Sequence, residues 1–208
     1  MPDGEDLVPT VGAILNNAFM EDSDFRNTLQ GLNLQLVKIA HSSNDVLMKF
    51  GLQLSFNSHV ISSYHATRAI ELLHAEILAQ FPKSPDLLFG LMHSFALEAV
   101  FGLWRARQLF KQAPVVRLLG ERAEKVADVF SSTFPFLKEA RDALAHDDER
   151  VFGIVKGKEL GGGQEHRQWI SLRGTKLGCK NANLKDIEFH FPTASYFDLV
   201  CKLKEILT

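Results

Sequence analysis

Apolar residues recur at intervals of three and four along most of the first 150 residues, as they do on the buried face of an α-helix. One helix start is explicit, because Ser84 can accept hydrogen bonds from free amides and Pro85 suits a first helical turn. The pattern predicts helices at about 24–41, 44–81 with a break near Gly51–Ser58, 85–111, 114–130 and 133–146. Five or six helices of this length predict a helical bundle over residues 1–150.

The pattern changes after Arg150 to short alternating runs separated by glycine. These runs predict strands at Val151–Lys156, Gln168–Arg173 and Asp186–Phe191, with turns at Gly161–Gly163 and Gly174–Asn183. In the last strand one face carries Ile187, Phe189 and Phe191 and the other carries Glu188 and His190. A final helix of about Thr193–Ile206 has an apolar stripe of Tyr196, Leu199, Val200, Leu203 and Leu207. We therefore expect residues 151–208 to form a small antiparallel β meander and a closing helix, packed on the bundle as one unit. The fold class is mainly α, and α+β overall.

Composition agrees with one domain that has an ordinary core, since 46% of the 208 residues are hydrophobic and 23% are charged. The two cysteines, Cys179 and Cys201, lack the spacing of a disulfide framework or a zinc site. The most apolar segment, Leu87–Trp104, contains Glu98, which is costly inside a bilayer. We expect no cofactor, no metal and no membrane association, and a cytoplasmic location.

Charge is distributed unevenly, although the net charge is only -2. Residues 150–185 contain eight Lys or Arg against Glu159 and Glu165, a local balance of 8 − 2 = +6. Such a segment can attract phosphate. The candidate phosphate-binding side chains of this segment are Lys156, Lys158, Arg173 and Lys176. A solvated face lying near the acidic N-terminus is the alternative interpretation.

Arg141 falls within the apolar stripe of the helix expected at 133–146. At about 100° per residue from Phe134, it lies in the centre of the stripe formed with Leu137 and Leu144. An unpaired buried guanidinium would cost several kcal/mol, so Arg141 needs either a carboxylate partner or an opening to a cleft. Glu139, Glu98 or another acid of the core are the candidate partners in a purely structural role.

The segment RDALAHDDER, residues 141–150, resembles the signature of the HEPN family (higher eukaryotes and prokaryotes nucleotide-binding). That signature is an arginine, a polar residue and, after four to six intervening positions, a histidine near the end of a late bundle helix. Arg141, Asp142 and His146 match it. Arg68 and His74 have a permitted spacing too, but Ala69 stands where the polar residue belongs.

The resemblance implies a metal-independent endoribonuclease, or a non-catalytic RNA or nucleotide binder with the same bundle. Arg141 would hold the scissile phosphate and His146 would act as general acid or base, while Asp142 would orient or polarise the imidazole. It also implies a homodimer in which two copies of the motif meet, and a toxin or defence role with an antitoxin protein as a partner. The alternative is a non-enzymatic interaction module in which Arg141 is a structural ion.

Two other groups receive ordinary interpretations. His59, His65 and His74 lack the spacing of a helical metal site, so we expect partly buried structural histidines. Trp104-Arg105-Ala106-Arg107 places cations near the negative end of a helix, which the helix dipole explains.

Overall fold

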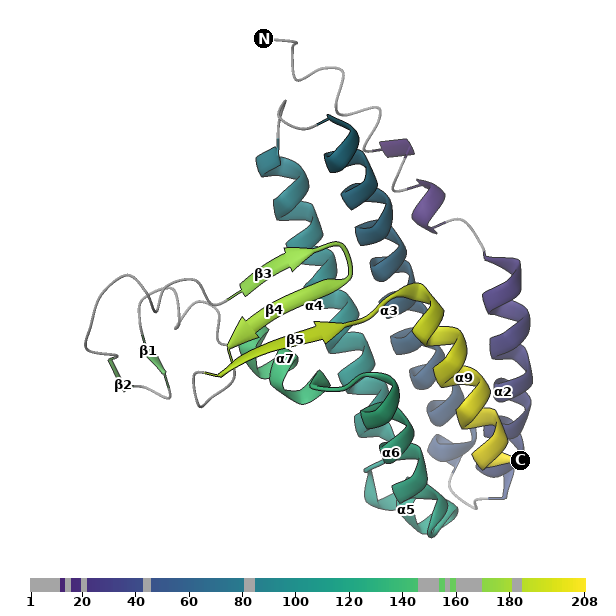
Figure 1. The fold of residues 1–208 in the computed structure, drawn as a ribbon. Coiled ribbons are helices and arrows are strands. Elements are labelled where there is room, and N and C mark those ends of the chain that lie inside the picture. Colours follow the sequence, from purple (N-terminus) through teal and green to yellow (C-terminus); the bar gives the residue numbers. More distant parts are fainter. Residues whose placement is uncertain are drawn as a thin grey trace.

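The computed structural model describes residues 12–13, 16–19, 22–42, 46–80, 85–145, 154–155, 158–159, 170–180 and 185–208. Six helices with defined bounds precede the strands: α2 (Ser23–His41), α3 (Val46–Gln80), α4 (Pro85–Leu109), α5 (Ala113–Leu119), α6 (Arg122–Thr133) and α7 (Leu137–Ala145). The strands are β1 (Ile154–Val155), β2 (Lys158–Glu159), β3 (Ile170–Arg173), β4 (Lys176–Lys180) and β5 (Asp186–His190), and α9 (Thr193–Leu207) follows them. The mainly helical fold with a small antiparallel sheet and a closing helix is confirmed (Figure 1).

The strands form two antiparallel sheets, β1-β2 and β3-β4-β5. The three-stranded sheet packs against α7, and its inner face contributes Leu177 and Phe189 to the core. Glu188 and His190 are exposed on the other face, as the alternation predicted. The sheet therefore has one apolar face on the bundle and one polar face toward solvent.

Helix α9 lies against α2, α3 and α6, so the end of the chain belongs to the same core as the bundle (Figure 1). The predicted stripe is confirmed, because Tyr196, Leu199, Val200, Leu203 and Leu207 are all buried. The Tyr196 hydroxyl lies 2.7 Å from Ser63 Oγ and 2.8 Å from Thr67 Oγ1. Burial raises the pKa of the Tyr196 hydroxyl, so this group stays neutral and fixes α9 on α3.

Asp22 fixes the start of α2 on α3, the helix that Tyr196 also contacts. Its carboxylate accepts hydrogen bonds from the backbone amides of Asp24 and Phe25, at 3.1 and 3.0 Å, and from the Tyr64 hydroxyl. Burial would raise the pKa of this carboxyl, but the hydrogen bonds and the nearby Arg68 guanidinium together hold it below its usual value. Asp22 is thus an N-cap whose carboxylate also joins α2 to α3.

Three details of the sequence prediction are wrong. Helix α3 has no break at Gly51–Ser58. Leu52 and Phe56 are buried there, and their packing outweighs the low helix propensity of Gly51. The helix predicted at 114–130 divides at Gly120, whose φ of 57° ends α5. Strand β4 lies in the region predicted as a turn, and only Gly174 and Thr175 separate it from β3.

Several other predicted features lie outside the described residues: His146, the Gly161–Gly163 turn, and most of the Val151–Lys156 strand, of which Ile154–Val155 is described as β1.

Candidate functional site

Helix α7 positions Arg141 at the edge of its buried face. The buried residues of this helix are Leu137, Ala140, Ala143 and Leu144, and it packs against α4, β4 and β5. Arg141 lies about 90° around the helix from the centre of that set, at 100° per residue. Its side chain is 27% exposed. The predicted position in the centre of the stripe is therefore wrong. The buried face extends away from Arg141 through Ala140 and Ala143, and Phe134, expected on the other side of Arg141, caps α6 and lies outside α7.

Trp104 of α4 supports the Arg141 guanidinium. The carbon at the centre of that group lies 4.7 Å from the centroid of the Trp104 ring, and Arg107 approaches the same ring at 5.4 Å. Contacts of this kind contribute about 0.5–2 kcal/mol, depending on how far the cation is desolvated. The indole thus holds two cations close together, at the place where α4 and α7 meet.

Asp142 is the carboxylate that pairs with Arg141. Arg141 Nη1 lies 3.0 Å from Asp142 Oδ1, and the Asp142 side chain is 35% exposed. The acids expected in a structural role do not serve: Glu98 accepts a hydrogen bond from Ser62, and no ion pair joins Glu139 to Arg141. The arginine and the polar residue of the motif therefore contact each other directly.

The donors of Arg141 differ in their availability. Nε is enclosed and has no hydrogen-bond partner, and Nη1 faces Asp142. Among the described residues Nη2 makes no hydrogen bond or ion pair. Arg107 has an enclosed Nε of the same kind, and its Nη2 donates to Ser131 Oγ at 3.4 Å. Counting only the part of the chain that the structure describes, two guanidinium groups face one carboxylate around Trp104, and Nη2 of Arg141 is available to an acceptor.

The remaining predicted site residues are only partly described. His146 and Lys156 lie outside the described residues, and for Lys158 only its place in β2 is given. Arg173 and Lys176 face each other in register at the ends of β3 and β4. The structure therefore brings together Arg141 with Asp142, and Arg173 with Lys176.

Sequence reasoning missed Trp104 and Arg107 as neighbours of the candidate site. Both were ascribed to the end of a helix, and no local pattern connects them to α7. The signal in the sequence is weak: a tryptophan followed after three positions by an arginine places both on one face of a helix.

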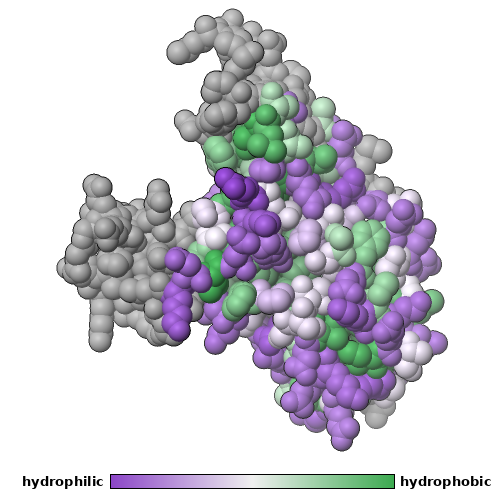
Figure 2. All heavy atoms as spheres, viewed as in Figure 1, coloured by the Kyte–Doolittle hydropathy of each residue, from purple (hydrophilic) through white to green (hydrophobic). Residues whose placement is uncertain are grey.

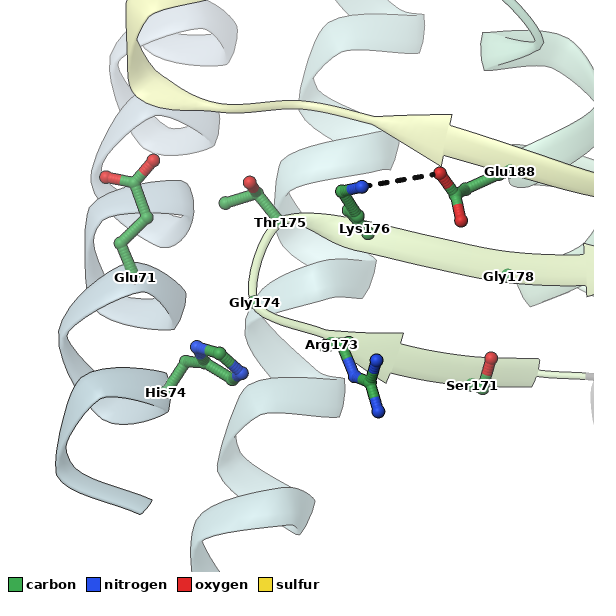
Figure 3. A pocket seen from close by; sticks show the side chains of 9 residues that line it. All are labelled: Glu71, His74, Ser171, Arg173, Gly174, Thr175, Lys176, Gly178 and Glu188. Atoms are coloured by element: carbon green, nitrogen blue, oxygen red, sulfur yellow. Dashed lines mark ion pairs between the residues drawn. The ribbon is translucent and has the colours of Figure 1, made fainter. Parts of the chain in front are cut away.

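A cavity of about 610 Å³ lies where the β3–β4 turn meets α3. Its lining includes Arg173 and Lys176, together with Glu71 and His74 of α3 (Figure 3). Figure 2 shows that hydrophilic residues gather on the face of the sheet in view. The polar face of the sheet thus contains a second, distinct concave site.

No protein-family model, curated protein or solved structure matches this chain. Among the described helices, none is both long enough and apolar enough to cross a membrane.

Proposed function

We propose that the protein is a metal-independent endoribonuclease of the HEPN type, with Arg141 and His146 as its working residues. The observation that supports the proposal is the state of Arg141. Its guanidinium is held on Trp104 and by Asp142 and is partly exposed, and its Nη2 makes no hydrogen bond or ion pair with a described residue. A cation fixed in this way is prepared to bind phosphate oxygen without first being ordered.

In the proposed reaction the ribose 2′-oxygen attacks the adjacent phosphorus and the bond to the 5′-oxygen breaks. A base removes the 2′-hydroxyl proton, and an acid protonates the departing 5′-oxygen. His146 performs one of these proton transfers, since imidazole gains and loses a proton near neutral pH. Arg141 stabilises the charge that grows on the phosphate oxygens. The products carry a 2′,3′-cyclic phosphate and a 5′-hydroxyl.

Asp142 has a more limited role in this proposal than the resemblance implied. Because its carboxylate pairs with Arg141, it positions the guanidinium and lowers the local positive charge. Lys156 and Lys158 belong to the segment with a local charge balance of +6, and we assign them to binding of the RNA backbone.

Digestion of a mixed single-stranded RNA in EDTA tests the proposal. Wild type should release fragments with cyclic phosphate ends, and both His146→Ala and Arg141→Ala should lose this activity while still folding. His41→Ala is the matched control, since this exposed histidine ends α2 and should leave cleavage unchanged. Cleavage by His146→Ala at the wild-type rate, or dependence of cleavage on added metal, would refute the assignment.

Partners and location belong to the same proposal. We expect a homodimer, a toxin or defence role restrained by an antitoxin protein, and a cytoplasmic setting that suits an RNA substrate and the free cysteines. Phe136 is 50% exposed directly before α7, and offers an apolar surface for such a contact. Phe136→Asn tolerates the φ of 65° found there, and should convert a dimer into monomers on analytical ultracentrifugation. A wild-type protein that sediments as a monomer would contradict the proposed homodimer.

A non-catalytic interaction module is the second candidate. It is favoured by the contacts of Arg141 with Trp104 and Asp142, which also suit a structural ion. In that case Arg141→Ala would lower the melting temperature and leave RNA affinity unchanged.

A further inference from the structure

The cavity beside the β3–β4 turn is built by two features of the backbone. Gly174 has a φ of 57°, which favours glycine and allows a turn of only two residues. Gly178 of the central strand has no side chain, and leaves a depression between Ser171 and Glu188 (Figure 3). A methyl group added at Gly178 would come within 2.7 Å of Ser171 Oγ. The hollow therefore exists because the central strand carries glycine at this position.

Hydrogen-bond donors in the cavity are unused. Arg173 makes no ion pair and no hydrogen bond, and the same holds for the His74 ring, among the residues that the structure describes. The Thr175 hydroxyl also lacks a hydrogen-bond partner there. In Figure 3 His74 and the Arg173 guanidinium lie toward one side of the turn, and the Glu71 and Glu188 carboxylates lie toward the other.

Both carboxylates in the lining already have donors. Glu71 accepts from the Thr193 amide at 3.0 Å and from the Thr193 hydroxyl, so it holds the start of α9. Glu188 pairs with His190 and, at 3.7 Å, with Lys176. The hydrogen bond from His190 and, to a smaller extent, the positive charge of Lys176 hold the pKa of Glu188 below its ordinary value. Each carboxylate keeps lone pairs that a ligand hydroxyl can reach.

This arrangement selects among anionic ligands. The Arg173 guanidinium suits one phosphate group, which accepts two parallel hydrogen bonds from arginine, and the His74 ring lines the same cavity. The two flanking carboxylates would repel the successive charges of a nucleic-acid chain. Apart from the His74 ring, no lining residue is aromatic, so the cavity offers little on which a nucleobase can stack. Carboxylates and hydroxyl groups around the phosphate position suit a ligand rich in hydroxyl groups.

We propose that the cavity between α3 and the β3–β4 turn binds a small sugar phosphate, with the phosphate on Arg173 and His74 and sugar hydroxyls toward Glu188, Glu71 and Ser171. The volume of about 610 Å³ lies within the range of natural small-molecule sites. This site is separate from the one at Arg141, and its ligand is independent of any ribonuclease activity.

Isothermal titration calorimetry with ribose 5-phosphate tests the proposal directly. We expect the full-length protein to bind ribose 5-phosphate more tightly than inorganic phosphate, and to bind ribose without phosphate more weakly than either. Arg173→Ala should weaken binding by about tenfold or more, since a charged hydrogen-bond pair is lost. Arg173→Lys should recover only part of this loss, because a point charge lacks the two-pronged geometry.

Two further variants separate binding from folding. Gly178→Val should fill the floor of the cavity and reduce affinity, and valine is well suited to a strand. Arg117→Ala removes an exposed arginine of α5 that lies outside the cavity and should bind like wild type. Absence of binding at millimolar ribose 5-phosphate, tighter binding of adenosine 5′-monophosphate, or equal affinity in wild type and Arg173→Ala would each overturn the proposal.

Discussion

Arg141 in the middle of α7 and Arg173 at the end of β3 are both partly or fully exposed arginines of a small helical protein, yet their surroundings differ. Arg141 lies over Trp104 and pairs with Asp142, whereas Arg173 has neither an aromatic support nor an acid partner among the described residues. The first guanidinium is ordered before any ligand arrives, and its removal also removes packing. The second contributes little to the fold, and its position is explained by the cavity it lines. Stability and ligand binding should therefore respond differently to mutation at these two sites.

The largest effect is expected at the support of Arg141. Trp104→Ala removes a half-buried ring that packs on the core, and should lower the free energy of unfolding by about 2–4 kcal/mol. Urea denaturation measures this, with Trp104→Phe as the variant that keeps an aromatic face for the two arginines. A loss below about 1 kcal/mol would mean that the indole does not anchor this corner of the bundle.

Asp22 is a charged residue with several contacts inside the fold, and its mutation gives a reference value for a structural charge. Asp22→Ala should cost about 1–2 kcal/mol at neutral pH through the lost cap and the lost Tyr64 contact. Because its pKa is lowered in the folded state, the carboxylate stabilises the fold above the unfolded value of about 3.9, and this contribution disappears as the pH falls through the folded value. The wild-type and mutant stabilities should therefore converge below about pH 4. Asp24→Ala is the control; a constant difference down to low pH would contradict the account.

Removal of Arg141 should have an intermediate effect. Arg141→Ala is expected to destabilise the protein by about 1 kcal/mol, the sum of a modest cation–π contact and a weak, partly exposed ion pair. Arg141→Lys should retain part of this. Thermal melts of both variants at low and high salt measure the change in stability. A loss of about 3 kcal/mol or more in the free energy of unfolding would favour a purely structural arginine.

Arg173→Ala should have the smallest effect, within about 0.5 kcal/mol of wild type in the same melts. The side chain is exposed and makes no hydrogen bond or ion pair among the described residues. A clear destabilisation would show that Arg173 supports the hairpin and would weaken the contrast with Arg141.

The sequence predicted the elements whose periodicity is strong and local. The five-residue stripe of α9 and the alternation of Asp186–His190 were read correctly, because burial follows the repeat of one helix or one strand. Strand β4 was missed since Gly174, Gly178 and a lysine at each end resemble a loop. The position of Arg141 within the apolar stripe was wrong because Phe134 lies outside α7 and because Ala140 and Ala143, which no large apolar side chain marks, extend the buried face away from Arg141.

The candidate sites were less predictable than the fold. Arg141 and Asp142 were found because they are adjacent in the sequence. Trp104 reaches Arg141 only through the packing of α4 on α7, and His74 reaches Gly174 only through the contact of α3 with a hairpin turn. Contacts between distant segments depend on the whole fold and leave no local pattern in the sequence.

The central claim is that Arg141 is held in place so that it can bind a phosphate of RNA. Fluorescence anisotropy with a 2′-O-methyl oligonucleotide, which cannot be cleaved through the 2′-oxygen, measures this binding across a range of salt concentrations. Arg141→Ala should bind about tenfold more weakly than wild type, with a salt dependence smaller by about one phosphate contact, while Arg117→Ala binds normally. Equal affinities and equal salt slopes for wild type and Arg141→Ala would contradict the claim.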